Sequence, residues 1–239
     1  MVVSVAICDD LKSEREALKG RIKQFSEEND VVFRIDEYSS GEELLKRFGR
    51  QYDLIFLDIE MDGMDGLSTA WRIRQTDTIV TIFFSTQHNQ YAYDSFALEP
   101  VGYVLKSEVY SVFAERLKKA IAMMRVRKTG IVVSFQGEKR YLELGRILYL
   151  EYFEHCVIIR MVDGTSEKSR ESFKDILNQD KEGVLLQISR NTAVNLLWID
   201  ECQDGYIKLK SVKRKFDVTL RKRRKIENLY IKHCRKSML

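Results

Sequence analysis

Several short apolar runs in the first half of the chain end on residues that could do chemistry. The run VSVAIC ends at Asp9 and Asp10, LIFL at Asp58, VTIFFS at Thr86 and GYVL at Lys106. In a parallel sheet the carboxyl ends of the strands share one edge, so these side chains are expected in one crevice. Crowded carboxylates repel one another unless a cation joins them. Because hard oxygen ligands favour magnesium, the sequence predicts a magnesium site with a hydroxyl and an ammonium beside it.

Each of these residues has a simpler interpretation when it is taken alone. A strand-terminal Asp often caps a helix or a turn, Thr86 could be an ordinary strand residue, and Lys106 could be solvated. Suitable residue types at four strand ends together favour the site.

The first half alternates apolar runs with amphipathic segments, as βα units around a parallel sheet do. Strands are predicted over 3–8, 32–38, 54–58, 80–86 and 102–106. Helices are predicted over 12–28, 41–48, 67–75, 90–98 and 109–127. This pattern predicts one doubly wound α/β domain.

The two halves of the chain carry opposite net charge. Residues 1–124 hold 15 Lys and Arg against 21 Asp and Glu, a net −6, and residues 125–239 hold the remaining 25 and 15, a net +10. The asymmetry predicts two domains with different partners, a cation or metal for the first and a polyanion for the second. The predicted domains cover 1–124 and 131–239, with a short linker over 125–130.

Composition also indicates a compartment. The sequence has no uncharged apolar run of about 18 residues, and its acidic pair comes too early for a signal peptide, so a cytoplasmic protein is expected. The four cysteines form no CxxC or Cys/His motif, so reduced thiols are expected rather than a zinc site or a disulfide framework.

The second half has the pattern of a mainly β domain, with turn signals such as DG between short strands. Strands are predicted over 131–135, 139–144, 147–153, 156–162, 185–190, 193–199, 206–211 and 216–220. One helix is predicted over 172–179, and a basic segment ends the chain. No helix-turn-helix pattern or zinc-finger spacing occurs, so nucleic acid would be bound by strands and loops.

The first half resembles a response-regulator receiver domain, the phosphorylatable half of a two-component system. The resemblance rests on Asp9 and Asp10, on LDIEMDGMDG around Asp58, and on Thr86, Tyr103 and YVLK. It implies a flavodoxin-like fold, with five parallel strands in the order 2-1-3-4-5 and helices on both faces. It also implies that a sensor histidine kinase phosphorylates Asp58 and that the phosphorylated domain dimerises.

The resemblance implies a role for each residue of the crevice. Asp58 would be the phosphoacceptor, Thr86 and Lys106 would contact the phosphoryl group, and Thr86 and Tyr103 would be the switch residues. Magnesium would be held by Asp9, Asp10, Asp58 and the backbone carbonyl of Glu60.

Three residues depart from the receiver pattern. Asp62 and Ser107 stand where proline is common, and Gln87 stands where a small residue is usual. These departures concern the rates of phosphorylation and hydrolysis rather than the role of Asp58.

The second half resembles the LytTR DNA-binding domain. The resemblance rests on ILYLEYFEHCVIIRMVDGT, on LLQISRNTAVNLLWIDE and on the YIKLKS and VTLRKRRKIE segments. It implies a mainly β module whose loops enter successive major grooves of direct-repeat DNA. The DNA-facing residues that it implies are His155, Cys156, Arg190, Asn191, Arg221, Lys222 and Arg224.

The residues of the second half differ in what they are expected to contact. Arg190 is the best candidate for reading bases, because a guanidinium can meet guanine O6 and N7 together. The RKRRK cluster over 221–225 is expected to contact phosphates rather than bases. Ser189 stands where the family often has His, and Asn195 is expected to be structural.

These features predict a DNA-binding response regulator that is phosphorylated on Asp58, dimerises and regulates transcription. No enzymatic activity is expected apart from self-catalysed phosphoryl transfer to Asp58 and hydrolysis from it. Two alternatives remain open: an output module that binds RNA or protein, or a magnesium-dependent phosphatase of the haloacid dehalogenase type. Such a phosphatase needs a second Asp two residues after its nucleophile, where this chain has Glu60.

Overall fold

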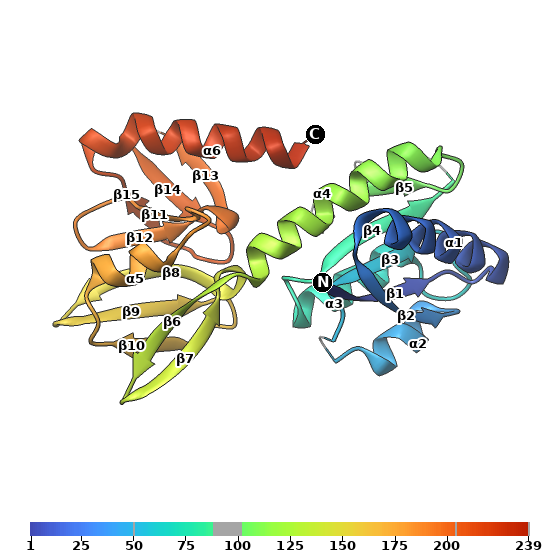
Figure 1. The fold of residues 1–239 in the computed structure, drawn as a ribbon, viewed down its shortest axis with the longest axis horizontal. Coiled ribbons are helices and arrows are strands. Elements are labelled where there is room, and N and C mark those ends of the chain that lie inside the picture. The colour runs from blue at the N-terminus through green and yellow to red at the C-terminus, as the bar shows by residue number, and fades with distance from the viewer. Residues whose placement is uncertain (50, 88–101, 204, 239) are drawn as a thin grey trace. The chain divides into compact units, whose positions relative to one another are not determined.

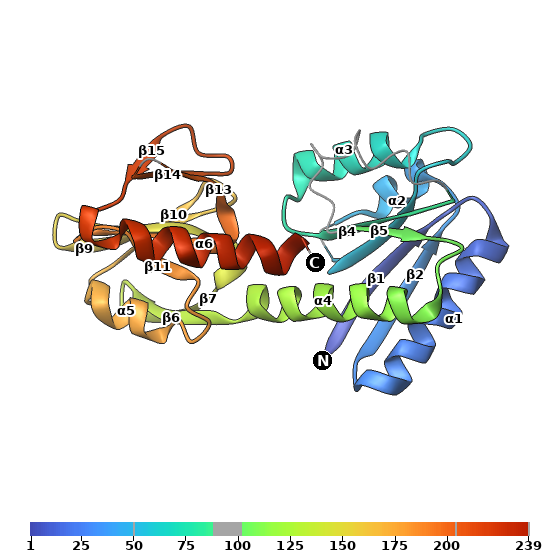
Figure 2. The ribbon, with the colours of Figure 1, turned by 90° about the horizontal axis from the view of Figure 1, so that it is seen from above.

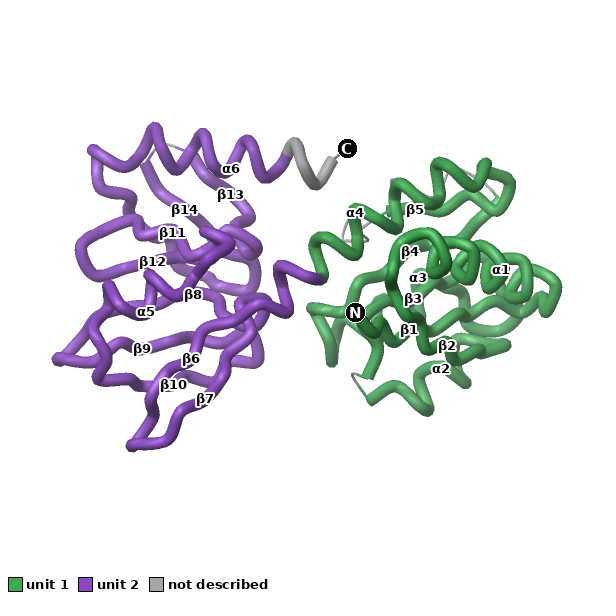
Figure 3. Tube along the Cα trace, viewed as in Figure 1, with its two compact units in different colours: residues 1–124 green, residues 125–239 purple. Residues whose placement is uncertain are grey.

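A computed structural model describes residues 1–49, 51–87, 102–203 and 205–238. The chain divides into two compact units, residues 1–124 and 125–239, which are drawn in separate colours in Figure 3 and described separately below. The helix predicted over 90–98 lies outside the described residues.

The first unit is a five-stranded parallel sheet in the order β2-β1-β3-β4-β5 (Figure 1). Its strands are β1 (Val2–Cys8), β2 (Val32–Tyr38), β3 (Leu54–Asp58), β4 (Thr81–Thr86) and β5 (Gly102–Leu105). Its helices are α1 (Lys12–Asn29), α2 (Gly41–Arg47), α3 (Gly66–Thr76) and α4 (Tyr110–Lys128), and the last continues into the predicted linker. The predicted strand order and flavodoxin-like fold are confirmed.

Helices cover both faces of this sheet, as Figure 2 shows with α1 and α4 below it and α2 and α3 above it. Leu54 and Phe56 of β3 pack in one core with residues of α1 and α4, and Ile55 and Leu57 pack in the other with residues of α2 and α3. Because successive strand side chains point to opposite faces, a strand buried on both sides is apolar at every position. The continuous run LIFL therefore ends at the sheet edge with Asp58, the first charged residue after it.

A glycine brings α3 close to the end of β3. A Cβ atom added to Gly66 would lie 2.0 Å from the backbone oxygen of Asp58, and its amide donates to Ile59 O at 3.0 Å. Asp65 caps the helix by accepting from Ser68 N at 2.6 Å. Only glycine allows this approach, so the turn after Asp58 is fixed against its own strand.

The second unit contains three antiparallel sheets, which matches the predicted mainly β domain. The first has the order β10-β9-β8-β12-β11, formed by β10 (Ser166–Ser169), β9 (Cys156–Met161), β8 (Ile147–Phe153), β12 (Thr192–Asn195) and β11 (Leu185–Gln187). The second is β13 (Ile199–Gln203), β14 (Tyr206–Leu209) and β15 (Lys215–Asp217), and the third is β6 (Gly130–Phe135) with β7 (Glu138–Glu143). Two helices, α5 (Phe173–Gln179) and α6 (Arg223–Met238), complete the unit.

Three details of the second unit differ from the sequence prediction. The single strand predicted over 193–199 is wrong, because a 3-10 helix over Leu196–Trp198 separates β12 from β13. The strand β10 was not predicted, and the basic segment at the end of the chain is the helix α6.

Asn195 produces the break between β12 and β13. Its side chain is fully buried and donates from Nδ2 to the carbonyls of Leu144 and Ile147, both at 2.7 Å. Its Oδ1 accepts from Leu197 N at 3.0 Å, which caps the 3-10 helix. The expectation that Asn195 is structural is confirmed.

Among the described residues, every helix is too short or too polar to cross a membrane.

We expect Asn195→Ala to destabilise the second unit by about 2–4 kcal/mol, because it leaves two buried carbonyls without donors. The measurement is urea unfolding of the full chain followed by circular dichroism, with the two units allowed to unfold in separate transitions. Asn178→Ala is the control, since Asn178 is an exposed residue of α5 and should change stability by less than about 0.5 kcal/mol. Equal stabilities of the two variants would show that Asn195 does not hold the break.

Candidate functional site

The predicted crevice is an acidic pocket at the carboxyl edge of the parallel sheet. Asp9 and Asp10 follow β1 and Asp58 ends β3, and each offers a carboxylate oxygen within 4.8 Å of those of the other two. Lys106, which follows β5, extends its Nζ to 2.8 Å from Asp9 Oδ2 and 2.8 Å from Asp58 Oδ2. The structure therefore brings together the predicted carboxylates and the predicted ammonium.

Burial makes these charges depend on one another. The side chains of Lys106, Asp9 and Asp58 are only 9, 5 and 4% exposed. Burial, together with the nearby charge of Asp9, raises the pKa of Asp58 to about 6, against the lowering effect of the hydrogen bond from Lys106. Burial alone would lower the pKa of Lys106, but hydrogen bonds to Asp58 and Asp9 raise it above its ordinary value. Lys106 is thus a charged ammonium that two crowded carboxylates share.

Backbone amides and one arginine hold the acidic turns in place. Asp9 Oδ1 accepts from Leu11 N at 2.9 Å, and Asp10 Oδ2 accepts from Asp62 N at 3.1 Å. Arg15 of α1 donates from Nη1 to the backbone carbonyls of Asp9 at 2.6 Å and Asp10 at 3.3 Å. Arg15 was not predicted from the sequence. Its place in the first turn of α1, soon after the acidic pair, could have indicated that it contacts them.

Of the other predicted pocket residues, Thr86 and Glu60 lie at the same sheet edge, and Tyr103 lies within β5, three residues before Lys106. Thr86 ends β4 and is fully buried, and its carbonyl accepts from Lys106 N at 3.0 Å. Tyr103 of β5 is half-buried, with its ring stacked on Phe84 at a centroid distance of 5.7 Å. Glu60 is exposed and places its amide 3.4 Å from Asp58 Oδ1. The roles of these residues as switch and metal ligand stay predictions.

The donor set fits a hard divalent cation. Three carboxylates converge from two adjacent strand ends, and oxygen ligands of this kind suit magnesium. Lys106 contacts Oδ2 of Asp9 and Oδ2 of Asp58, whereas Oδ1 of Asp58 lies 3.4 Å from the amide nitrogen of Glu60. Acidic oxygen atoms are therefore available to a cation beside the ammonium.

Two of the predicted DNA-facing segments of the second unit lie side by side. Tyr152 N at the end of β8 donates to Asn191 O at 2.7 Å, which joins the β8–β9 hairpin to the loop that carries Arg190. The hairpin turns at Glu154 and His155, with φ angles of 48° and 61°. Positive φ angles are favourable for glycine and less favourable for residues with a side chain. Glu154 and His155 nevertheless adopt them, and their side chains are exposed at the tip of the hairpin.

The third segment packs against the same loop. Thr219 N donates to Ile188 O at 3.0 Å, and Lys222 Nζ donates to Gln187 O at 3.0 Å. Burial lowers the pKa of Lys222, and the charge of Lys225 lowers it further. Lys222 therefore supports the loop that carries Arg190, a role that its place in the basic cluster did not indicate.

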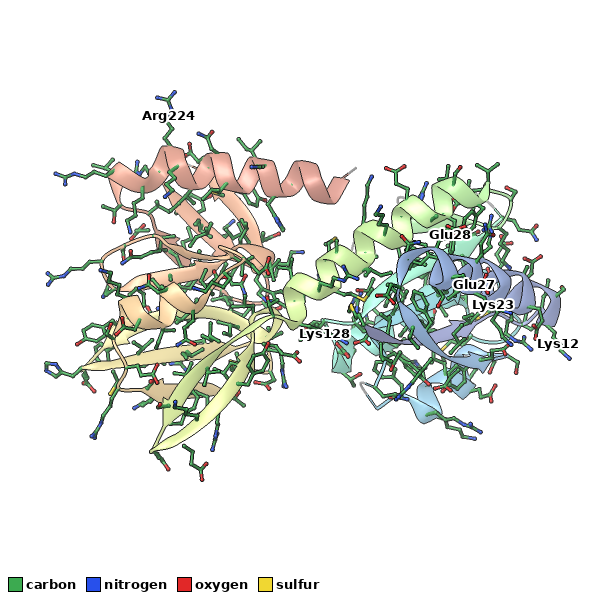
Figure 4. All side chains as sticks on the ribbon, viewed as in Figure 1. Lys12, Lys23, Glu27, Glu28, Lys128 and Arg224 are labelled. Atoms are coloured by element: carbon green, nitrogen blue, oxygen red, sulfur yellow. The ribbon has the colours of Figure 1, made fainter. Side chains whose placement is uncertain are left out.

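The remaining cations of this surface are open to a ligand. Arg190, Arg221 and Arg224 are exposed, and none of them forms an ion pair within the described part of the chain. Figure 4 shows Arg224 extending from α6 away from the strands. By contrast, Lys208 pairs with Glu201 and Arg214 pairs with Glu151 at 2.5 Å, so these cations serve the fold. The exposed arginines, the hairpin tip and the Asn191 loop form a candidate nucleic-acid interface.

The raised pKa of Asp58 predicts how stability depends on pH in metal-free protein. A carboxylate whose folded pKa of about 6 exceeds its ordinary 3.8 costs stability when it is ionised, and the cost fades as pH falls from 6 towards 4. Asp58→Asn should therefore stabilise the first unit at pH 7.5 by on the order of 1–3 kcal/mol, and by less at pH 5. Urea unfolding in a chelator measures this, with the exposed Glu60→Gln as control. If Asp58→Asn is less stable than the wild type at pH 7.5, the ionised carboxylate of Asp58 does not destabilise the folded protein.

Comparisons with known proteins match both units. A response regulator receiver domain matches residues 5–122, and a LytTr DNA-binding domain matches residues 137–230. The sensory transduction protein LytR of Streptococcus mutans is 28% identical over 223 residues, covering 85% of this chain and 88% of that protein. The sensory transduction protein LytT of Oceanobacillus iheyensis is 30% identical over 186 residues, covering 74% of each chain.

A third relative matches about half of each chain. The positive alginate biosynthesis regulatory protein of Pseudomonas aeruginosa is 34% identical over 128 residues, covering 52% of this chain and 50% of that protein. These matches favour neither the phosphatase nor the RNA-binding alternative. With an acidic pocket in one unit, a basic surface on the other and both domains matched, the chain belongs to the LytTR family of response regulators and is a DNA-binding response regulator.

Proposed function

We propose that Asp58 is the phosphoacceptor and that a sensor histidine kinase is the donor. The observation that carries the proposal is the ammonium of Lys106 at 2.8 Å from both Asp58 and Asp9, beside a third carboxylate. An oxygen of Asp58 attacks the phosphorus of the kinase phosphohistidine, forming an O–P bond as the P–N bond breaks and the imidazole leaves. Hydrolysis of the acyl phosphate later returns the carboxylate and inorganic phosphate.

Magnesium is the proposed cofactor. Asp9, Asp10, Asp58 and the backbone carbonyl of Glu60 would hold it, since the three carboxylates converge and Glu60 lies two residues after the end of β3. When bound, it would supply positive charge for the phosphoryl oxygens, which dominates catalysis of such transfers.

Lys106, Thr86 and Tyr103 would detect the phosphoryl group. The phosphoryl oxygens would attract the ammonium of Lys106, which pairs with carboxylates in this structure. The hydroxyl of Thr86 would also hydrogen-bond to the phosphoryl oxygens. We infer that Tyr103 then moves further into the protein and that the receiver, residues 1–124, dimerises. Through a linker over 125–130, this would bring two LytTR domains, residues 131–239, onto adjacent sites.

The DNA-facing residues proposed are His155, Cys156, Arg190, Asn191, Arg221, Lys222 and Arg224. Their segments are joined by hydrogen bonds, and the +10 net charge of residues 125–239 suits a polyanion. Arg190 would read a base, the exposed Arg221 and Arg224 would contact phosphates, and Lys222 would hold the loop. We propose direct-repeat promoter DNA as the partner and the cytoplasm as the place where the protein meets both DNA and kinase.

Incubation of the full chain with magnesium and acetyl phosphate should add one phosphoryl group, and Asp58→Asn should abolish the addition, because an amide is no nucleophile here. Intact-protein mass spectrometry measures the change. Asp62→Asn is a matched control, since Asp62 is an exposed carboxylate beside the pocket and should still allow labelling. Full labelling of Asp58→Asn would place the phosphoacceptor elsewhere.

Arg190 and Arg224 should affect DNA binding differently. Arg190→Ala should cost about 1–3 kcal/mol on bound fragments selected from genomic DNA and reduce discrimination between sequences. Arg224→Ala should weaken binding to all sequences alike and flatten the salt dependence by about one unit. Fluorescence anisotropy across a salt series measures both, with the exposed Lys174→Ala of α5 as control. A uniform loss for Arg190→Ala would make it a phosphate contact.

A further inference from the structure

Three residues from α1, α4 and the turn before α4 meet beside Lys106. Arg21 of α1 donates from Nη2 to the backbone carbonyl of Glu108. Arg116 of α4 donates from Nη1 to the backbone carbonyl of Tyr103, and its Nε lies 3.7 Å from Glu108 Oε2. We call Arg21, Glu108 and Arg116 the Glu108 clamp.

The carboxylate of Glu108 is buried, which is unfavourable in free energy for a charged group. Its side chain is 6% exposed, and neither of its oxygens accepts a hydrogen bond within the described residues. A buried carboxylate is normally hydrogen-bonded, so an exception points to a role. Burial raises the pKa of Glu108, opposed by the charges of Arg116 and Arg21. The two guanidinium groups thus offset part of the cost of burying this carboxylate.

The clamp grips the chain on both sides of Lys106. Arg116 holds the carbonyl of Tyr103, three residues before Lys106, and the clamp holds Glu108, two residues after it. Ser107, rather than a proline, lies between Lys106 and Glu108. The backbone of this turn is therefore not restricted by a proline ring. The guanidinium of Arg21 lies 5.3 Å from the ring centroid of Phe113, which restrains the clamp in turn.

We propose that Arg21, Glu108 and Arg116 are positioning residues that hold Lys106 for phosphoryl transfer to Asp58, an inference that rests on the proposed function. Lys106 must keep its ammonium at 2.8 Å from Asp58, on a turn that also carries the backbone hydrogen bonds Lys106 N to Thr86 O and Glu108 N to Leu105 O, both at 3.0 Å. Small misplacements of a catalytic group can cost about 10²-fold in rate. The clamp touches neither carboxylate of the pair that Lys106 bridges, so it acts only through Lys106.

The first test is the rate of labelling by acetyl phosphate at saturating magnesium. Arg116→Met should lower the maximal rate about tenfold, a fraction of the loss expected for a displaced catalytic group, and Arg116→Lys should recover part of it. Lys118→Met is the control, because Lys118 is an exposed residue of the same helix and should label like wild type. If Arg116→Met is labelled at the wild-type rate, the proposed role of the clamp is wrong.

The second test separates positioning from general destabilisation. If Arg116 acts through Lys106, Arg116→Met should have no further effect on the residual labelling of Lys106→Met. Independent, additive losses would mean that Arg116 only stabilises the fold, and would overturn the proposal.

A third measurement does not depend on phosphoryl transfer. Hydrogen exchange of the full chain should show faster exchange of the amides of residues 102–109 in Arg116→Met than in Lys118→Met. If wild-type protein takes no phosphoryl group, the proposed function fails, and the exchange of this segment still tests the clamp. Unchanged exchange would show that Arg116 does not hold the turn.

Discussion

The first unit depends on one ammonium shared by two carboxylates. Asp9 and Asp58 end neighbouring strands, and their buried charges would repel one another without Lys106 between them. This contact requires that β1, β3 and β5 keep their places in the sheet and that the turns after them stay fixed. Gly66, Arg15 and the Glu108 clamp meet that requirement by holding the turns that follow β3, β1 and β5.

In the proposed function, the same contact would make the pocket respond to phosphorylation. An ammonium that neutralises carboxylates in the resting protein has a stronger partner once a phosphoryl group with more negative charge is present on Asp58. Its turn is clamped to α4, the helix that runs from Tyr110 to Lys128 across the boundary between the two compact units. A shift of Lys106 would therefore be transmitted to a long helix through Arg116 rather than lost in a loose loop.

Much of the receiver could be predicted from sequence because its strands are buried on both faces, so that each is a short apolar run ended by a polar residue. That pattern located Asp9, Asp58 and Lys106 at one edge. The pairing of Lys106 with both carboxylates could not be predicted, since it depends on side-chain reach between strands distant in sequence. Arg116 was missed because nothing local distinguishes it from a solvated helix residue, whereas Arg15 lies close enough to the acidic pair to have been predicted.

The second unit was less predictable, for physical reasons that its residues show. Asn195 ends β12 by bonding to carbonyls 48 and 51 residues earlier in the chain, which no local pattern reveals inside an apolar run. In α6 the many basic residues obscured the buried contact made by Ile226 and the hydrogen bond that Tyr230 donates to Asp200 O at 2.9 Å. Both units nevertheless use buried hydrogen bonds and ion pairs between residues distant in sequence, Lys106 with Asp58 in the first and Asn195 with Leu144 in the second.

In the proposed function, phosphorylation of Asp58 controls the DNA affinity of the basic unit. The most direct test measures the affinity of full-length protein for a fragment selected from genomic DNA, at fixed salt, before and after treatment with acetyl phosphate and magnesium. We expect tighter binding after treatment, by up to about 10²–10⁴ on a two-site fragment if dimerisation links the sites, and no change in Asp58→Asn. Equal affinity of the phosphorylated and unphosphorylated wild-type protein would contradict it.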